Sequence, residues 1–194
     1  MRRSARAAVG TLALVLCACG IPTSQQADVV PPRNVPFQLL SPVVPSTTTT
    51  TIAPAPTVAQ PIYLVKSSDA VTAVVRQVVS PATLVQVLDA LLVGPTVAQT
   101  AAGLSTALPQ SVRVVSATTI GPTATIAMNP AFTAISGPSQ VLAVAQLVMT
   151  ATRQPGVTSV LFTVDGAIVP VPTASGATTA SPVTAASYAA LLSP

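Results

Sequence analysis

Proline is unevenly distributed along this chain of 194 residues, and its distribution decides which part can form a folded core. Nine of the 20 prolines lie between residues 20 and 61, together with five consecutive threonines at 47–51. Proline fixes φ and removes a backbone hydrogen-bond donor, so regular helices and sheets are not expected there. Threonine and proline at this density are typical of a stalk that carries O-linked sugars. Residues 62–194 remain to form one domain, which is long enough to bury a core without a metal or a disulfide.

The first 18 residues are arranged as a secretory signal peptide. Arg2, Arg3 and Arg6 precede an apolar stretch from residue 7 to residue 19, and a basic start before a short apolar run is typical of such signals. The stretch is too short to cross a bilayer, which takes about 20 apolar residues. Residues 1–18 are therefore expected to be removed on export.

A lipid attachment site follows at once. The sequence Leu-Cys-Ala-Cys at 16–19 resembles the lipobox of bacterial lipoproteins, in which a small residue precedes the modified cysteine. The resemblance implies cleavage before Cys19, diacylglycerol on its sulfur and usually an acyl chain on its amine; the alternative is a signal that is cleaved without lipidation. Each buried CH₂ contributes about 0.8 kcal/mol, so two or three acyl chains hold a protein firmly on a membrane. We expect the protein to be anchored to the cell membrane through Cys19, on the extracytoplasmic side.

The charge of the chain excludes one class of partner. Eight Lys plus Arg and four Asp give a formal net charge of +4, but removal of the signal takes away three arginines and leaves five basic side chains against four acidic ones. A nucleic-acid-binding surface requires a basic patch, so nucleic acid is excluded as a partner. Cleavage also removes Cys17, which leaves Cys19 without a second cysteine for a disulfide.

Residues 19–61 are expected to form the linker between the lipid and the domain, and one part of it is unusually apolar. The sequence Val-Pro-Phe-Gln-Leu-Leu at 35–40 contains Phe37, one of only three phenylalanines in the chain. One hypothesis is that this segment docks on the domain as an extended strap. The other is that Phe37 belongs to a short motif that binds a partner.

Two helices are predicted in the domain. Ser80 as N-cap and Pro81 at the first position predict the start of a helix that ends at Gly94-Pro95. The apolar residues between them recur at helical spacing and form one stripe: Leu84, Val87, Leu88, Leu91 and Leu92. A second helix is predicted over residues 139–153. Its circumference is almost entirely apolar, which indicates a helix buried on more than one side.

Strands are predicted over residues 62–66, 70–79, 112–120, 123–128, 157–164 and 167–171, because these runs are rich in β-branched residues and are bounded by turn residues. Asp165-Gly166 is a strong signal for a two-residue hairpin. The element order is therefore ββαββαβ(β). It predicts an α+β fold with a single antiparallel or mixed sheet and two helices packed on one face.

Several blocks of the domain carry a family resemblance. Residues 91–96 (LLVGPT), 103–109 (GLSTALP) and 145–152 (AQLVMTAT), followed by a late Tyr188, resemble the GerMN domain. This domain is known from spore-germination and sporulation proteins and from actinobacterial lipoproteins, including the LpqB group. The resemblance implies an α/β domain related to ring-building modules of sporulation and secretion assemblies, without catalytic activity. One departure is Gln99, which stands where the family commonly has an acidic residue.

The composition excludes most catalytic and metal sites. The chain has no histidine and no glutamate, so histidine triads, zinc–histidine sites and glutamate-based acid–base pairs cannot form. The three aspartates of the domain, Asp69, Asp89 and Asp165, are expected at solvated turns or on the polar side of a helix. No enzyme activity, metal or cofactor is therefore expected.

Gln146 is the polar side chain that the sequence singles out, since it lies on the most apolar helix. An unpaired buried amide costs about 1–3 kcal/mol, so Gln146 is expected to satisfy backbone groups of a neighbouring loop; a ligand contact is the alternative. The function expected for the domain is non-catalytic binding to an envelope protein or to its own copies. The alternative function is binding of cell-wall glycan or of a small apolar molecule.

Overall fold

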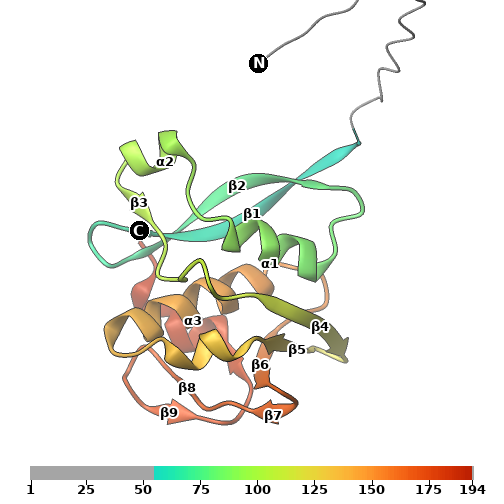
Figure 1. The fold of residues 1–194 in the computed structure, drawn as a ribbon, viewed down its shortest axis with the longest axis vertical. Helices are drawn as coiled ribbons and strands as arrows, with labels where there is room; N and C mark the ends of the chain where they lie inside the picture. Colours follow the sequence, from blue (N-terminus) through green and yellow to red (C-terminus); the bar gives the residue numbers. More distant parts are fainter. Residues whose placement is uncertain (1–54, 194) are drawn as a thin grey trace, which may run out of the picture. The chain divides into compact units, whose positions relative to one another are not determined.

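The computed structural model describes residues 55–193, and Figure 1 shows the order of their elements. One sheet contains β1 (Thr57–Lys66), β2 (Val71–Val79) and β3 (Leu104–Ser105), in the order β2-β1-β3. A second sheet has the order β10-β6-β5-β4, with β7 beside β6. Its strands are β4 (Val114–Ile120), β5 (Thr123–Met128), β6 (Ser159–Val164), β7 (Ala167–Ile168) and β10 (Val183–Thr184). The short strands β8 (Val171–Pro172) and β9 (Thr178–Thr179) pair with each other.

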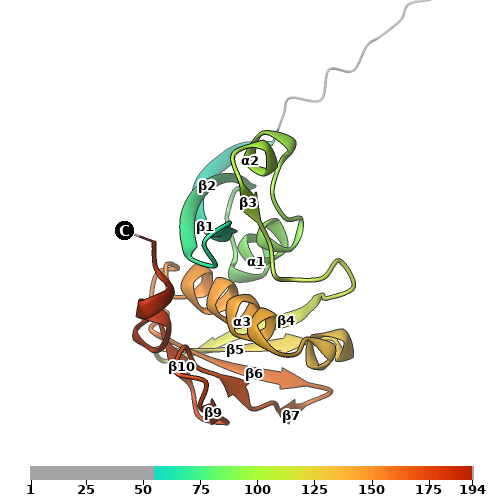
Figure 2. The same ribbon diagram turned by 90° about the vertical axis from the view of Figure 1, so that its left-hand side faces the viewer.

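Two helices, α1 (Leu84–Leu92) and α3 (Pro138–Ala151), lie between these two sheets. Figure 2 shows both helices with the β1–β2 hairpin on one side and the β5–β6 strands on the other. Nine consecutive residues of α3, from 143 to 151, are buried. The prediction of a helix buried on more than one side is therefore confirmed. A mixed α and β domain is also confirmed, whereas a single sheet with both helices on one face is wrong. A helix that is apolar all round must be covered on both sides.

The β1–β2 hairpin begins earlier than expected. β1 starts at Thr57, five residues inside the segment assigned to the linker, and Pro61 lies within it opposite Val75. Proline cannot donate to a sheet ladder and is tolerated where one side of a strand is unpaired. β3 pairs with β1 at Val65 and Lys66, so within residues 55–193 β2 is the only strand that pairs with β1 at Pro61.

The second sheet is mixed. β4 and β5 form an antiparallel hairpin, whereas β5 and β6 run parallel. Parallel neighbours need a long crossover connection, and here η3 (Pro130–Ala134) and α3 provide it. At the far end of β6, Asp165 and Gly166 both have positive φ, 50° and 80°, and β6 pairs antiparallel with β7. The predicted hairpin at Asp165-Gly166 is thus confirmed.

The start of α1 differs from the prediction. The N-cap is Thr83, and its hydroxyl and the Gln86 side chain form a reciprocal capping box. Ser80 and Pro81 therefore precede the helix, because Thr-x-x-Gln supplies better partners for the first free N–H groups. The end agrees with the prediction: Gly94 has a φ of 80° and its N–H donates to the Leu91 carbonyl at 2.9 Å.

Besides β3, β9, β10 and η3, two more elements of the domain were not predicted. α2 (Val97–Ala101) is a five-residue helix with its own capping box, made by Thr96 and Gln99. At the C-terminal end, η4 (Ala185–Leu191) carries Tyr188 into the core, where it is fully buried. The Tyr188 hydroxyl donates to the Pro172 carbonyl at 2.8 Å, which ties η4 to β8.

Candidate functional site

The most unusual arrangement of polar groups lies where β3 separates from β1. The β1–β3 register pairs Lys66 with Leu104 and Val65 with Ser105, so a longer ladder would place Ala107 opposite Tyr63. Instead, Gln146 lies between them. Its Nε2 donates to the Tyr63 carbonyl at 2.9 Å, and its Oε1 accepts from the Ala107 N–H at 2.8 Å. The buried amide of Gln146 thus replaces one step of the sheet ladder.

Thr150 completes this arrangement one helical turn later. Its hydroxyl oxygen accepts from the Tyr63 N–H at 3.1 Å. Both polar backbone groups of Tyr63 are therefore bound by side chains of α3, and both side chains are fully buried. Gln146 and Thr150 are two of the three polar residues of the AQLVMTAT block, so the geometry accounts for two positions of that block by a structural role.

The end of α3 continues the contact with β1. The Arg153 Nε donates to the Tyr63 hydroxyl at 2.8 Å, and its guanidinium carbon lies 5.8 Å from the centre of the Tyr63 ring. Gln154 donates to the Gln60 side chain at 3.1 Å. The Arg153 contact was not foreseen, because Tyr63 lies 90 residues away in the chain.

A second polar junction holds α2 to the rest of the domain. Arg76 of β2 donates to the Gly94 carbonyl at 2.9 Å and to the Gln99 side chain at 3.1 Å. Gln99 also accepts from the Thr96 N–H at 2.9 Å. The residue that departs from the family pattern therefore still binds an arginine, although as a neutral amide.

No cluster of reactive groups is present in the described range. The aspartates lie where they were expected: Asp69 and Asp165 have positive φ at turns, and Asp89 is exposed on α1. Residues 55–193 hold no group of three or more His, Cys, Asp or Glu side chains that could bind a metal. Every buried side-chain nitrogen or oxygen in the same range has a hydrogen-bond partner.

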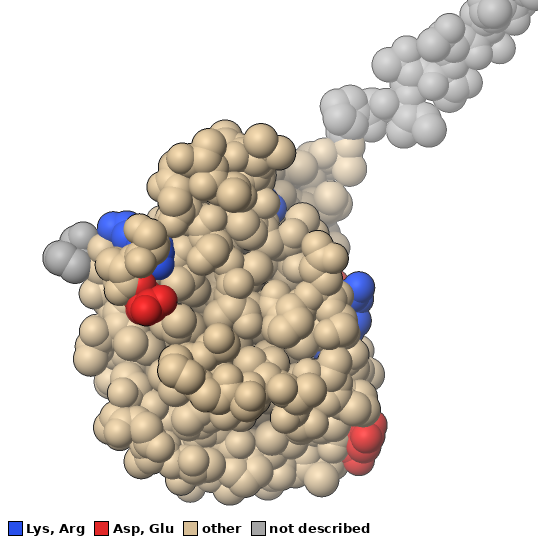
Figure 3. Space-filling view, turned by 60° about the vertical axis from the view of Figure 1, so that its left-hand side comes forward, with Lys and Arg blue, Asp and Glu red and all other residues tan. Residues whose placement is uncertain are grey.

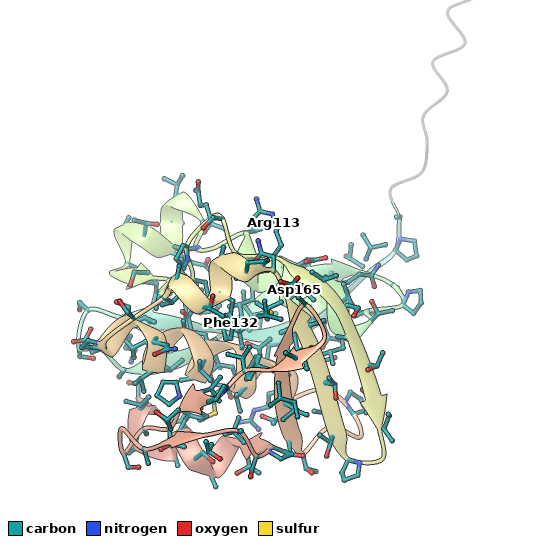
Figure 4. The ribbon with its side chains drawn as sticks, turned by 60° about the horizontal axis from the view of Figure 1, so that its bottom comes forward. Arg113, Phe132 and Asp165 are labelled. Atoms are coloured by element: carbon teal, nitrogen blue, oxygen red, sulfur yellow. The ribbon has the colours of Figure 1, made fainter. Side chains whose placement is uncertain are left out.

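Two hollows lie on the surface of the domain, and they differ in size. The larger, about 640 Å³, lies among the start of α3, the β8–β9 hairpin and Leu191. The smaller, about 330 Å³, is lined by Asp89, Leu92, Val93, Gln110 and Arg113. The four aromatic side chains of the domain line neither hollow, since Tyr63, Phe132, Phe162 and Tyr188 are buried. Figure 4 shows Phe132 inside the domain, where it stacks on Phe162 with ring centres 5.3 Å apart.

The exposed surface combines few charges with several exposed apolar side chains. Residues 55–193 contain four basic and three acidic side chains, and Figure 3 shows a face on which they lie only near the margin. Figure 4 shows Arg113 and Asp165 at the same end of the second sheet. Val93 and Val97, on either side of the α1–α2 connection, are 77% and 90% exposed, and α2 contributes no buried residue.

The expected lipid site and the expected interaction segment lie elsewhere in the chain. The signal peptide 1–18, Cys19, the linker up to residue 54 and Phe37 lie outside the described residues. None of the helices within 55–193 has the length and apolar character needed to span a membrane.

Comparisons with known proteins identify the domain. A family model described as Germane, sporulation and spore germination, matches residues 61–169. The tandem GerMN domains of the sporulation protein GerM from Bacillus subtilis share 23% identity at a TM-score of 0.52, covering 68% of this chain and 46% of that one.

No curated protein matches this chain. Two further solved structures are similar at lower identity and lower TM-score. The first GerMN domain of GerM alone has 16% identity and a TM-score of 0.45, covering 58% of this chain and 86% of that one. A candidate lipoprotein from Clostridium perfringens has 18% identity and a TM-score of 0.45, covering 73% and 98%. The relationship to the LpqB group stays a prediction. The family match extends over more than half of the chain, which therefore belongs to the Germane family of sporulation and spore germination domains.

Proposed function

We propose that this protein is a lipoprotein of the cell envelope whose Germane domain binds another protein and catalyses no reaction. The anchor is the lipid on Cys19, and residues 20–54 set the distance between the membrane and the domain. The observation that carries the proposal is the combination of few charges with exposed valines at the α1–α2 connection.

The anchoring part rests on the sequence. Three arginines, a short apolar run and Leu-Cys-Ala-Cys at 16–19 follow the order that export and lipidation require. A diacyl anchor holds the domain at the membrane surface, on the extracytoplasmic side in this proposal. The domain then searches for partners in two dimensions rather than in free solution.

The binding part rests on the surface of the domain. Gln146, the buried polar side chain that the sequence singled out, holds the fold together, and so does Thr150: both bind Tyr63. What remains for an outside partner is the exposed surface. Apolar side chains that are almost fully exposed, as Val97 is, gain free energy when another protein covers them.

The alternative function is binding of wall glycan or of a small apolar molecule. The hollow of about 640 Å³ beside the start of α3 favours it by its size. Sugar recognition commonly needs an aromatic face in the site, and the aromatic residues of the domain are buried. Titration with wall fragments tests the alternative: a rise in melting temperature would support it and count against the protein-binding role.

Membrane fractionation tests the anchor. Cys19→Ala removes the lipidated sulfur, whereas Cys17→Ala leaves Leu16, Ala18 and Cys19 in place and serves as the matched control. We expect the wild type and the Cys17→Ala protein in the membrane fraction, labelled by a palmitate analogue, and the Cys19→Ala protein unlabelled and released. A membrane-bound, unchanged Cys19→Ala protein would overturn the anchor.

Crosslinking in the intact envelope tests the binding role. We expect a discrete crosslinked protein species with the wild type and a clear loss with Val97→Asp, because a charge opposes burial of that site. Ser139→Asp places the same charge at an exposed position in the first turn of α3, outside the α1–α2 connection, and is the control. Recovery of no crosslinked protein from the wild type would reject the proposal.

A further inference from the structure

The second sheet ends in a strand whose outer side is unpaired. β4 lies at the margin of the sheet, and β5 is the only strand that pairs with it in the part of the chain that the structure describes. β4 has seven residues, whereas β10, at the opposite end of the strand order, has two. A free edge exposes alternate N–H and C=O groups that can pair with another strand.

Edge strands usually carry features that prevent such pairing. Lysine, proline, bulges and shortness are the common ones. β4 has the sequence Val-Val-Ser-Ala-Thr-Thr-Ile, with neither charge nor proline. An irregularity lies between Val114 and Ser116, at the start of the strand, and the register with β5 is regular from Ser116 to Ile120. Five consecutive residues therefore remain as a regular, uncharged edge.

The side chains of this strand are also exposed. Val115 is 67% and Ile120 79% exposed, and both are β-branched. Ser116 and Thr118 are exposed as well. β-Branched residues and threonine favour strand pairing through contacts with cross-strand neighbours.

The charge of the edge indicates the partner. An uncharged strand edge pairs without charge repulsion with another uncharged edge, and β4 of a second copy is such an edge. When β4 pairs antiparallel with β4 of a second copy, a two-fold axis passes through the middle of the strand. The nearest charge, Arg113, then lies at opposite ends of the paired strands, so the two arginines do not meet. Like charges directly opposite each other would oppose pairing, and this arrangement avoids them.

We propose that a second copy of this chain pairs antiparallel along β4, which joins the two five-stranded sheets into one continuous sheet. This rests on the proposed function, because the anchor brings copies of the chain together, and it goes beyond it by adding a self-pairing surface on β4 to the valines at the α1–α2 connection. Copies anchored in the same membrane plane meet with their domains at the same height, since the linkers are identical.

Charge substitutions at matched positions of the second sheet test the pairing. Thr118 on β4 lies directly opposite Thr125 on β5. Thr118→Lys places a charge at the edge, and Thr125→Lys places the same charge one strand further in. Two differently tagged copies of the full chain are expressed together, extracted from membranes in mild detergent and purified through one tag. The amount of the second tag measures pairing.

We expect the wild type and Thr125→Lys to recover the second copy. Recovery should fall by at least about ten-fold when both copies carry Thr118→Lys, because like charges then face each other. A Thr118→Lys copy expressed with a Thr118→Asp copy should regain pairing, which a variant that had merely unfolded would not do.

Three outcomes would overturn the proposal. The first is that wild-type copies do not recover each other. The second is that the mixed lysine–aspartate pair recovers no more of the second copy than the lysine pair does. Recovery of a different protein in place of the second copy, lost with Thr118→Lys, would assign the edge to that protein. Fractionation of the same cells distinguishes failure of the β4 contact from failure of the lipid anchor. A protein that is released from the membrane but still pairs rejects the anchor alone. A membrane-bound protein that does not pair rejects the β4 contact alone.

Discussion

Gln146 binds Tyr63 as a neighbouring strand would, with its side-chain Nε2 2.9 Å from the Tyr63 carbonyl oxygen. The primary amide has one donor group and one acceptor, as a peptide group has. It can therefore bridge two strands that have separated by the width of one side chain. β1, β3 and α3 are joined at this one residue.

Gln146→Leu is expected to destabilise the domain strongly. The substitution keeps the volume apolar but leaves the Tyr63 carbonyl and the Ala107 N–H without partners. Each buried unpaired group costs about 1–3 kcal/mol, so a loss of about 2–5 kcal/mol in the free energy of unfolding is expected. Urea unfolding measures it. Gln140→Leu, at a half-buried position near the start of the same helix, is the control. Equal losses in the two variants would contradict the assignment.

Thr150→Val should cost less, about 1–2 kcal/mol, because it removes one acceptor from the Tyr63 N–H and preserves the side-chain shape. Thr152→Val is the matched control, since the Thr152 hydroxyl binds the Val148 carbonyl of its own helix at 2.8 Å. The double variant Gln146→Leu/Thr150→Val should lose less than the two single losses together, because both residues hold Tyr63. Strict additivity in urea unfolding would show that they act independently.

Gln99→Glu should stabilise the domain. A carboxylate at this position accepts from Arg76 and from the N-terminus of α2, and charge-assisted bonds are stronger than neutral ones. We expect a gain of about 0.5–1 kcal/mol at neutral pH. The gain depends on an ionised carboxylate, so it should be lost as the pH falls through about 4.

Gln86→Glu is the control for this gain. Gln86 has the same capping position on α1, but no arginine binds its side chain among the described residues. Thermal unfolding in low and high salt compares the two variants. A gain at Gln86 as large as that at Gln99 would show that capping, and not Arg76, is responsible.

Tyr188→Phe should change how stability depends on alkaline pH. Burial raises the pKa of the Tyr188 hydroxyl, whereas an unfolded tyrosine ionises near pH 10. Above about pH 10 the unfolded wild type loses a proton that the folded state keeps, so the free energy of unfolding falls as the pH rises. Phenylalanine has no such proton.

The two proteins should therefore converge at high pH. At pH 7 the variant is less stable by about 1 kcal/mol, because the bond to the Pro172 carbonyl is lost. Between pH 9 and pH 11 this difference should shrink by about 1 kcal/mol. Urea unfolding at several pH values measures it, and a difference that stays constant would show that Tyr188 ionises equally in both states.

Part of this structure could be predicted because the signals are local. The end of α1 at Gly94 and the hairpin at Asp165-Gly166 depend on residues that are adjacent in the chain. The start of α1 was missed although its signal is also local: Thr83 and Gln86 form a capping box three residues apart, and so do Thr96 and Gln99 of α2. A search for that spacing would have found both helix starts.

The sequence by itself determined that α3 would be a helix buried on more than one side, since an almost entirely apolar circumference can be recognised from residues that are neighbours in the chain. Only the tertiary structure decided what covers it. The division into two sheets and the use of Gln146 and Thr150 on Tyr63 join residues 83 and 87 positions apart. Such contacts depend on how distant segments pack together in space. The spacing of side chains along a short stretch of sequence cannot predict them.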